Sequence, residues 1–105
     1  MIVTTGIDVA EGKIVETLGI VRGNTIRAKH VGTDIVAGLR NLVGGEVSEY
    51  TKLMAEAREQ AYDRMVRHAE EVGADAVIGV NFTTSMITQG AAEILAYGTA
   101  VRIER

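Results

Sequence analysis

The sequence predicts an α+β fold in which a mainly antiparallel sheet has two helices on one side. Three observations lead to this prediction. The apolar pattern runs strand, strand, helix, helix, strand, strand, with no linker between elements. The longest amphipathic stretch ends at Gly73, and two strands that contain glycine follow it. The length of 105 residues suits one domain over residues 1–105.

The first half of the chain contains two predicted strands and a short helix. Residues 2–5 form a short strand, and residues 14–29 form a long strand that two glycines bend. Thr33 or Asp34 can cap the first turn of the helix, and Gly44-Gly45 ends it. The apolar residues at helical spacing are Ile35, Val36, Leu39, Leu42 and Val43.

The second helix is the most regular predicted element. Ser48 is a suitable N-cap, and Glu49 in the first turn suits the helix dipole. The apolar stripe then continues to Val72, and Gly73 ends the helix. About 25 residues give a rod of roughly 37 Å, whereas a compact globule of this size is about 33 Å across. This length favours a helix that also packs against another subunit.

Each of the last two predicted strands, residues 76–82 and 92–103, has a bulky apolar face and a face of small residues. A turn at residues 88–90 joins them. We expect the long helix to contact the bulky residues, which are Ile78, Val80, Phe82, Leu95, Tyr97 and Val101. The small-residue face lacks the charges of a solvated sheet face, so we predict that another chain covers it. Its residues are Gly79, Asn81, Ile94, Ala96, Gly98 and Ala100.

Composition excludes several classes of function. The net charge of −3 and the pI near 5.3 argue against a nucleic-acid partner. The absence of cysteine removes disulfides, thiolate catalysis and zinc sites built from cysteine. No apolar run is long enough to span a membrane, and no signal peptide is visible, so a cytoplasmic location is expected. No phosphate-binding loop, dinucleotide motif or nucleophile elbow occurs, so neither a cofactor nor a catalytic residue is predicted.

Short motifs occur in order along nearly the whole chain. They are Met1-Ile2-Val3-Thr4-Thr5, Leu18-Gly19-Ile20-Val21, Gly38-Leu39-Arg40-Asn41, Gly44-Gly45 followed by Tyr50, Ala57-Arg58-Glu59, Gly73-Ala74-Asp75-Ala76-Val77-Ile78-Gly79-Val80 and Ala96-Tyr97-Gly98-Thr99-Ala100-Val101. In these motifs the chain resembles the YbjQ-like family. The resemblance implies a small α+β subunit, similar to the dodecin type, that assembles into a homopentameric ring. The function of this family is not established, and its heavy-metal-binding label is a hypothesis.

The residues themselves give little support to a metal site. The candidate ligands are His30 and His68. Soft metals prefer thiolate or thioether sulfur, and the chain has no cysteine to supply a thiolate. A single histidine at helical spacing is more often a packed or surface residue than a ligand. We therefore expect no metal site within one chain. One alternative stays open, because a ring could bring one residue from each subunit together near its axis.

One polar cluster is a candidate small-ligand site. It surrounds the predicted turn at Gly44-Gly45 and consists of Arg40, Asn41, Glu49, Tyr50 and Arg58. Guanidinium groups near a helix N-terminus could bind an anion. Surface ion pairs with neighbouring acids are the favoured interpretation, because ordinary helix surfaces carry such charges.

The sequence therefore favours a non-enzymatic, ring-forming cytoplasmic protein that binds a ligand or serves as a scaffold. Its expected partners are further copies of the same chain, five in number by the resemblance, without nucleic acid or membrane. Two alternatives remain. One is a metal-ion-binding protein, and the other is an enzyme whose site at the subunit interface would use Tyr50, Arg40 and Glu49.

Overall fold

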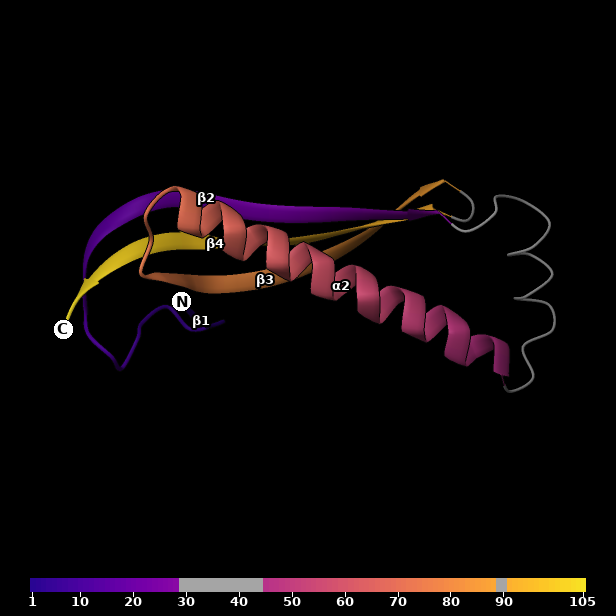
Figure 1. The fold of residues 1–105 in the computed structure, drawn as a ribbon, viewed down its shortest axis with the longest axis horizontal. Coiled ribbons are helices and arrows are strands. Elements are labelled where there is room, and N and C mark those ends of the chain that lie inside the picture. The colour runs from indigo at the N-terminus through magenta and orange to yellow at the C-terminus, as the bar shows by residue number, and fades with distance from the viewer. Residues whose placement is uncertain (29–44, 89–90) are drawn as a thin grey trace.

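A computed structural model describes residues 1–28, 45–88 and 91–105 of the chain. The elements are β1 (Ile2–Val3), β2 (Lys13–Ala28), α2 (Gly45–Glu71), β3 (Ala76–Thr88) and β4 (Ala91–Glu104). The strands form one sheet in the order β1-β3-β4-β2. β1 runs parallel to β3, and the other pairs are antiparallel. Figure 1 shows α2 lying across one face of this sheet. The predicted α+β fold with a mainly antiparallel sheet is confirmed, whereas the predicted short helix lies outside the described residues.

α2 begins earlier than the sequence predicts. Its first residue is Gly45, so Ser48 lies inside the helix and does not cap it. The predicted short helix and Gly44 lie outside the described residues, so the prediction that Gly44-Gly45 ends this helix is not tested, while Gly45 itself is the first residue of α2. Glycine is acceptable at a helix start, and Glu46 and Glu49 in the first turns suit the dipole at this end.

The C-terminal end of α2 follows the prediction. Gly73 has a φ of 78°, a backbone conformation that glycine adopts more easily than other residues. The Gly73 N–H donates to the carbonyl oxygen of Glu70, and the Ala74 N–H donates to that of Ala69, both at 3.0 Å. These two bonds form a Schellman motif, which satisfies the last carbonyl groups of the helix.

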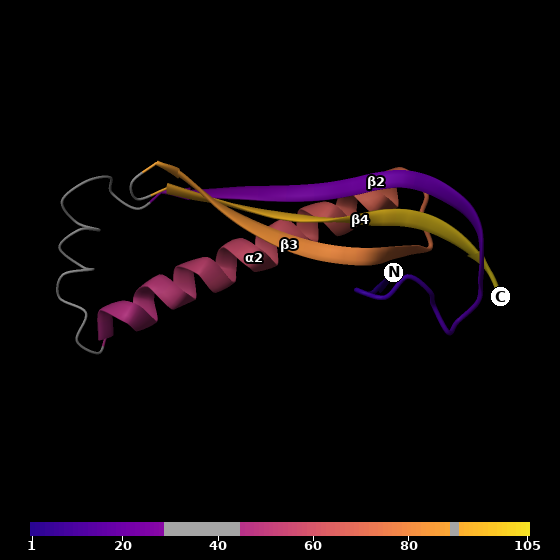
Figure 2. The same cartoon turned by 180° about the vertical axis from the view of Figure 1, so that it is seen from behind.

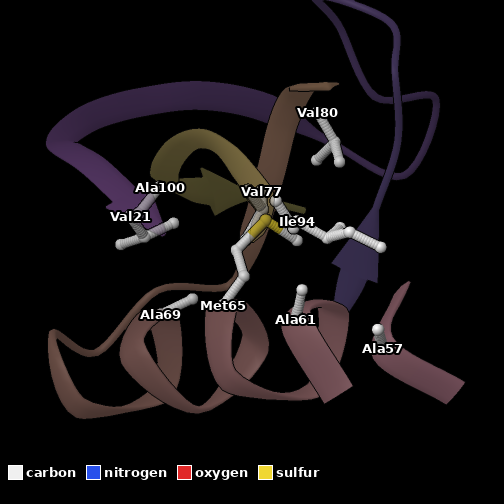
Figure 3. Close-up of a cluster of buried hydrophobic side chains, with 10 residues drawn as sticks. Val21, Ala57, Ala61, Met65, Ala69, Val77, Val80, Ile94 and Ala100 are labelled. Atoms are coloured by element: carbon white, nitrogen blue, oxygen red, sulfur yellow. The ribbon is translucent and has the colours of Figure 1, made fainter. Parts of the chain in front are cut away.

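The core lies between α2 and the sheet and is made almost entirely of small aliphatic side chains (Figure 3). α2 contributes Ala57, Ala61, Met65 and Ala69, and the sheet contributes Val21, Val77, Val80, Ile94, Ala96 and Ala100. Met65 is the largest of the fully buried side chains. Because alanine is short, the helix backbone comes close to the sheet. Adding a Cβ atom at Gly23 would overlap backbone atoms of α2.

The face that α2 covers differs from the predicted one. Leu95 and Tyr97 point to the opposite face, because Ile94, Ala96 and Ala100 alternate with them along β4 and lie in the core. Ile78 pairs with Thr99 and therefore also lies on the helix-free face. The prediction that these bulky residues meet the helix is wrong. A helix that presents alanines can approach only the small-residue face, so the larger residues lie on the other side.

A bulge in β3 explains part of this difference. The pairing with β4 shifts between Ile78 and Asn81, next to Gly79, whose φ is 60°. The extra residue reverses the alternation, so both Val77 and Val80 point into the core. Beyond the bulge, Phe82 pairs with Ala96 and lies on the helix side, yet 46% of its surface is exposed.

The subunit is elongated. Its Cα radius of gyration is 17.2 Å, and its principal extents are 53 × 22 × 16 Å. A compact domain of about 100 residues has a radius of gyration near 13 Å. In Figures 1 and 2, the C-terminal half of α2 lies beside β2 and β4, whereas its N-terminal end extends beyond the strands. Among residues 1–28, 45–88 and 91–105, no helix lies over one end of the helix-side face of the sheet.

Candidate functional site

Polar contacts join α2 to the outer edge of β2, which is an edge strand of the sheet. The Arg22 backbone N–H donates to Nδ1 of His68 at 3.2 Å. Nη1 of Arg64 donates to the backbone carbonyl oxygen of Asn24 at 2.6 Å. In an antiparallel pair, backbone groups alternate between the two sides of a strand, and these two point away from β4. α2 thus occupies the positions at which a further strand would bond to the middle of β2.

The helix-free face of the sheet has a row of hydrogen-bonding side chains at its centre. Tyr97 on β4 pairs with Arg22 on β2 and with Asn81 on β3. Asn81 is tied to the bulge, since its Nδ2 donates to the carbonyl oxygen of Gly79 at 3.1 Å. Next to this row on the same face, Nδ2 of Asn24 on β2 donates to Oε2 of Glu93 on β4 at 3.1 Å. This face can make hydrogen bonds to a polar ligand or to another chain.

The predicted polar cluster is only partly within the described residues. Arg58 is exposed on α2. Glu49 and Tyr50 belong to the N-terminal turns of α2, but their side chains lie outside the described part. Arg40 and Asn41 also lie outside it. The cluster therefore stays a prediction.

The structure gives one of the two candidate metal ligands a different role. His68 is half-buried in the last turn of α2, and its Nδ1 accepts the Arg22 N–H. His30 lies outside the described residues. In residues 1–28, 45–88 and 91–105, no group of three or more histidine, cysteine, aspartate or glutamate side chains could hold a metal ion. The same residues contain no helix with the length and apolar character needed to cross a membrane.

The predicted interface face belongs mostly to the interior of the chain itself. Ile94, Ala96 and Ala100 are buried beneath α2. A Cβ atom on Gly98 would lie 2.7 Å from Cγ1 of Val77 and 2.9 Å from the Ile78 carbonyl oxygen. The prediction that another chain covers these four residues is wrong, because α2 and β3 already cover them. Of the predicted interface residues, Gly79 and Asn81 lie nearer the surface.

Sequence reasoning missed the apolar side chains that remain at the surface. Phe82 and Met86 are exposed on the helix side of β3, and Ile20 and Ile26 are exposed on β2. A signal for the two on β3 was present, since no charged residue occurs from Ala76 to Ala92. A strand at the edge of a soluble monomer usually carries charges that prevent pairing with another chain. These exposed side chains are the candidate interaction surface of the molecule.

Comparisons with known proteins fit this architecture. Residues 1–104 match the family described as "YbjQ_1: Putative heavy-metal-binding". The chain belongs to this family. It is 59% identical over 103 residues to a UPF0145 protein of Methanosarcina acetivorans, covering 98% of this chain and 97% of that protein. It is 56% identical over 103 residues to a UPF0145 protein of Archaeoglobus fulgidus, covering 98% and 95%.

A solved structure has the same fold. The chain resembles a protein of unknown function from Pediococcus pentosaceus, assigned to the DUF74 family, with a TM-score of 0.70 and 15% sequence identity. The likeness covers 99% of this chain and 98% of the other. At this identity the comparison establishes the fold alone.

Proposed function

We propose that this YbjQ-family chain is the subunit of a closed homo-oligomer with a non-enzymatic role as a binding protein or scaffold. The supporting observation is an elongated subunit whose sheet carries exposed apolar side chains on both faces. Ile20 and Ile26 lie on the helix-free face, and Phe82 and Met86 lie on the helix side. A contact with another subunit would remove these large apolar side chains from water.

Closure around an axis follows from the symmetry of most soluble homo-oligomers. A closed assembly buries every copy of an interaction surface, whereas an open one leaves a copy free to add further chains. The resemblance to YbjQ-like proteins supplies five as the expected number of subunits. The residues of the chain give no number of their own.

The family description suggests a heavy metal, and the donor atoms of the described residues do not fit it. Soft metals favour sulfur ligands, but the chain has no cysteine. Among the described residues no three potential ligands gather, and Nδ1 of His68 already accepts a backbone hydrogen bond. A metal site would need donors from outside the described residues or from several subunits, so we give metal binding second place.

Native mass spectrometry of the untagged protein tests the proposal. We expect an assembly with a mass that is a multiple of the 11.2 kDa chain. Additional mass from a retained small molecule would favour the binding role, and its value would help to identify the ligand. A bare multiple of the chain mass would favour the scaffold role. A single chain at micromolar concentration would contradict the proposal.

A further inference from the structure

In the described part of the chain, two side-chain contacts hold the C-terminal half of α2 against the outer side of β2, and they respond differently to pH. Nη1 of Arg64 donates to the Asn24 carbonyl oxygen, and a guanidinium group keeps its charge in proteins. Nδ1 of His68 accepts the Arg22 N–H at 3.2 Å. A ring nitrogen of histidine accepts a hydrogen bond only while it carries no proton. The second contact therefore exists in one protonation state of His68 alone.

The contact also fixes the tautomer of the His68 ring. A neutral imidazole carries its single proton on Nδ1 or on Nε2. Because the Arg22 N–H donates to Nδ1, the proton of the neutral ring must lie on Nε2. A second proton at Nδ1 turns the acceptor into a donor, so that two N–H groups face each other. The Arg22 N–H then loses its acceptor.

Charged groups from α2 and β2 surround this ring. Arg64 and Glu71 lie about one turn before and one turn after His68 on α2, at spacings that bring side chains close together. Arg64 opposes a positive charge on the ring, whereas Glu71 and the dipole at this end of the helix favour one. On β2, the Arg22 side chain lies on the helix-free face, because its neighbour Gly23 faces α2.

The described parts of β3 and β4 beneath α2 contribute no further charge to this contact. The β4 residues in the core under the helix are Ile94, Ala96 and Ala100, and β3 contains no charged residue. Toward the start of β2, Oε1 of Glu16 pairs with Nε of Arg102 on β4 at 3.3 Å. Protonation of His68 therefore acts first on its own acceptor contact with β2.

Loss of this acceptor would open the structure locally. The Arg22 N–H lies on the outer side of an edge strand, so water reaches it once Nδ1 is withdrawn. The apolar contacts of Ala61, Met65 and Ala69 do not depend on pH and keep α2 packed on the sheet. The expected change is a local opening between the end of α2 and β2, with the core intact.

We propose that His68 is a pH-sensitive contact in which the neutral ring holds the end of α2 against the edge of β2 and protonation of Nδ1 releases it. The contribution of the contact to stability is present while the ring is neutral and is lost as the pH falls. This inference does not depend on the proposed assembly. Histidine is the side chain that ordinarily changes its charge between pH 5 and 8, and the chain has two histidines, His30 and His68.

Nitrogen-15 NMR of the His68 ring in the wild-type protein tests the first step. At about pH 7.5 we expect Nδ1 without a proton and Nε2 with one, and at about pH 5 we expect protons on both. The His68 signals are identified by their disappearance in His68→Asn. A neutral ring with its proton on Nδ1 would overturn the inference, because that nitrogen could not accept from Arg22.

Hydrogen exchange at the Arg22 amide tests the structural consequence. Its protection factor in the wild type should fall about fivefold from about pH 7.5 to about pH 5, the amount expected for one hydrogen bond. The Gly23 amide is the internal reference, because the alternation along β2 directs it toward β4.

Two matched variants separate the histidines. The fall at Arg22 should persist in His30→Asn and should disappear in His68→Asn, whose side-chain oxygen accepts at every pH. Equal protection at both pH values in the wild type, or the same fall in His68→Asn, would contradict the proposal. If His68→Asn fails to fold, the ratio of Arg22 to Gly23 protection in the wild type and in His30→Asn decides.

Discussion

Gly23 on β2 lies directly against the backbone of α2 at Ala61. A Cβ atom at position 23 would overlap the Ala61 carbonyl oxygen and the Met65 amide nitrogen. These are backbone atoms, so they cannot move aside as the end of a flexible side chain can. The close approach of helix and sheet thus depends on the missing side chain at Gly23.

Gly23→Ala should destabilise the chain by about 2–3 kcal/mol, since overpacking forces α2 away from the sheet. Urea denaturation at one fixed protein concentration measures the change. Gly6→Ala is the matched control, because a Cβ atom there would make ordinary contacts, 3.4 Å from Oγ1 of Thr4. Equal midpoints for the two variants would mean that α2 does not pack on Gly23.

His68→Ala should cost about 1 kcal/mol, because the Arg22 N–H loses its acceptor. His68→Asn should recover part of this loss, since the asparagine oxygen can occupy the position of Nδ1. Arg67→Ala, on the exposed surface of the same helix, is the control. If His68→Ala changed the unfolding free energy no more than Arg67→Ala, the contact between α2 and the β2 edge would be energetically unimportant.

The sequence predicted the elements well because their signals are local. Each of these signals can be recognised from residues that are close together in the sequence. They are the spacing of apolar residues in α2, the glycine at position 73 and the lack of charge in the strand that follows. β2 spans Lys13–Ala28 against a predicted 14–29, and the helix ends where Gly73 indicates. These features need no knowledge of the tertiary fold.

The covered face of the sheet was not predictable in the same way. The small-residue face correctly indicated that another backbone lies close to the sheet, but the sequence did not reveal that this backbone is α2 of the same chain. Gly79 lies in a bulge that reverses the alternation of β3, and a reversal by one residue exchanges the two faces. A Cβ atom on Gly98 would lie too close to Val77 and Ile78 of β3. The substitution Gly98→Leu would thus disturb the packing of β3 and β4 within one subunit, and it would not test an interface between subunits.

The predicted ligand sites depend on positions that local patterns do not fix. His68 was a weak metal candidate from its place beside the apolar stripe, yet it contacts Arg22, which lies 46 residues away in the sequence. Only the register of α2 over β2 brings the two together. The cluster around Arg40 and Tyr50 remains a prediction.

The purified untagged protein should bind no stoichiometric transition-metal ion through His68, because the chain lacks thiolate ligands and the described residues lack a three-ligand group. Elemental analysis after incubation with zinc, copper or cadmium and desalting measures this. A stoichiometric ion that disappears in His68→Ala would contradict the expectation.

Residue-resolved hydrogen exchange of the wild-type assembly tests the central claim most directly. The Thr84 amide points away from β4, and no strand of residues 1–28, 45–88 and 91–105 lies beside it, so protection of this amide would come from a contact outside these residues, which the proposed assembly supplies. We predict that Thr84 exchanges about as slowly as Thr83, whose amide bonds to β4, and that Ile26 on the β2 edge exchanges rapidly. Rapid exchange at Thr84 together with slow exchange at Thr83 would contradict the account.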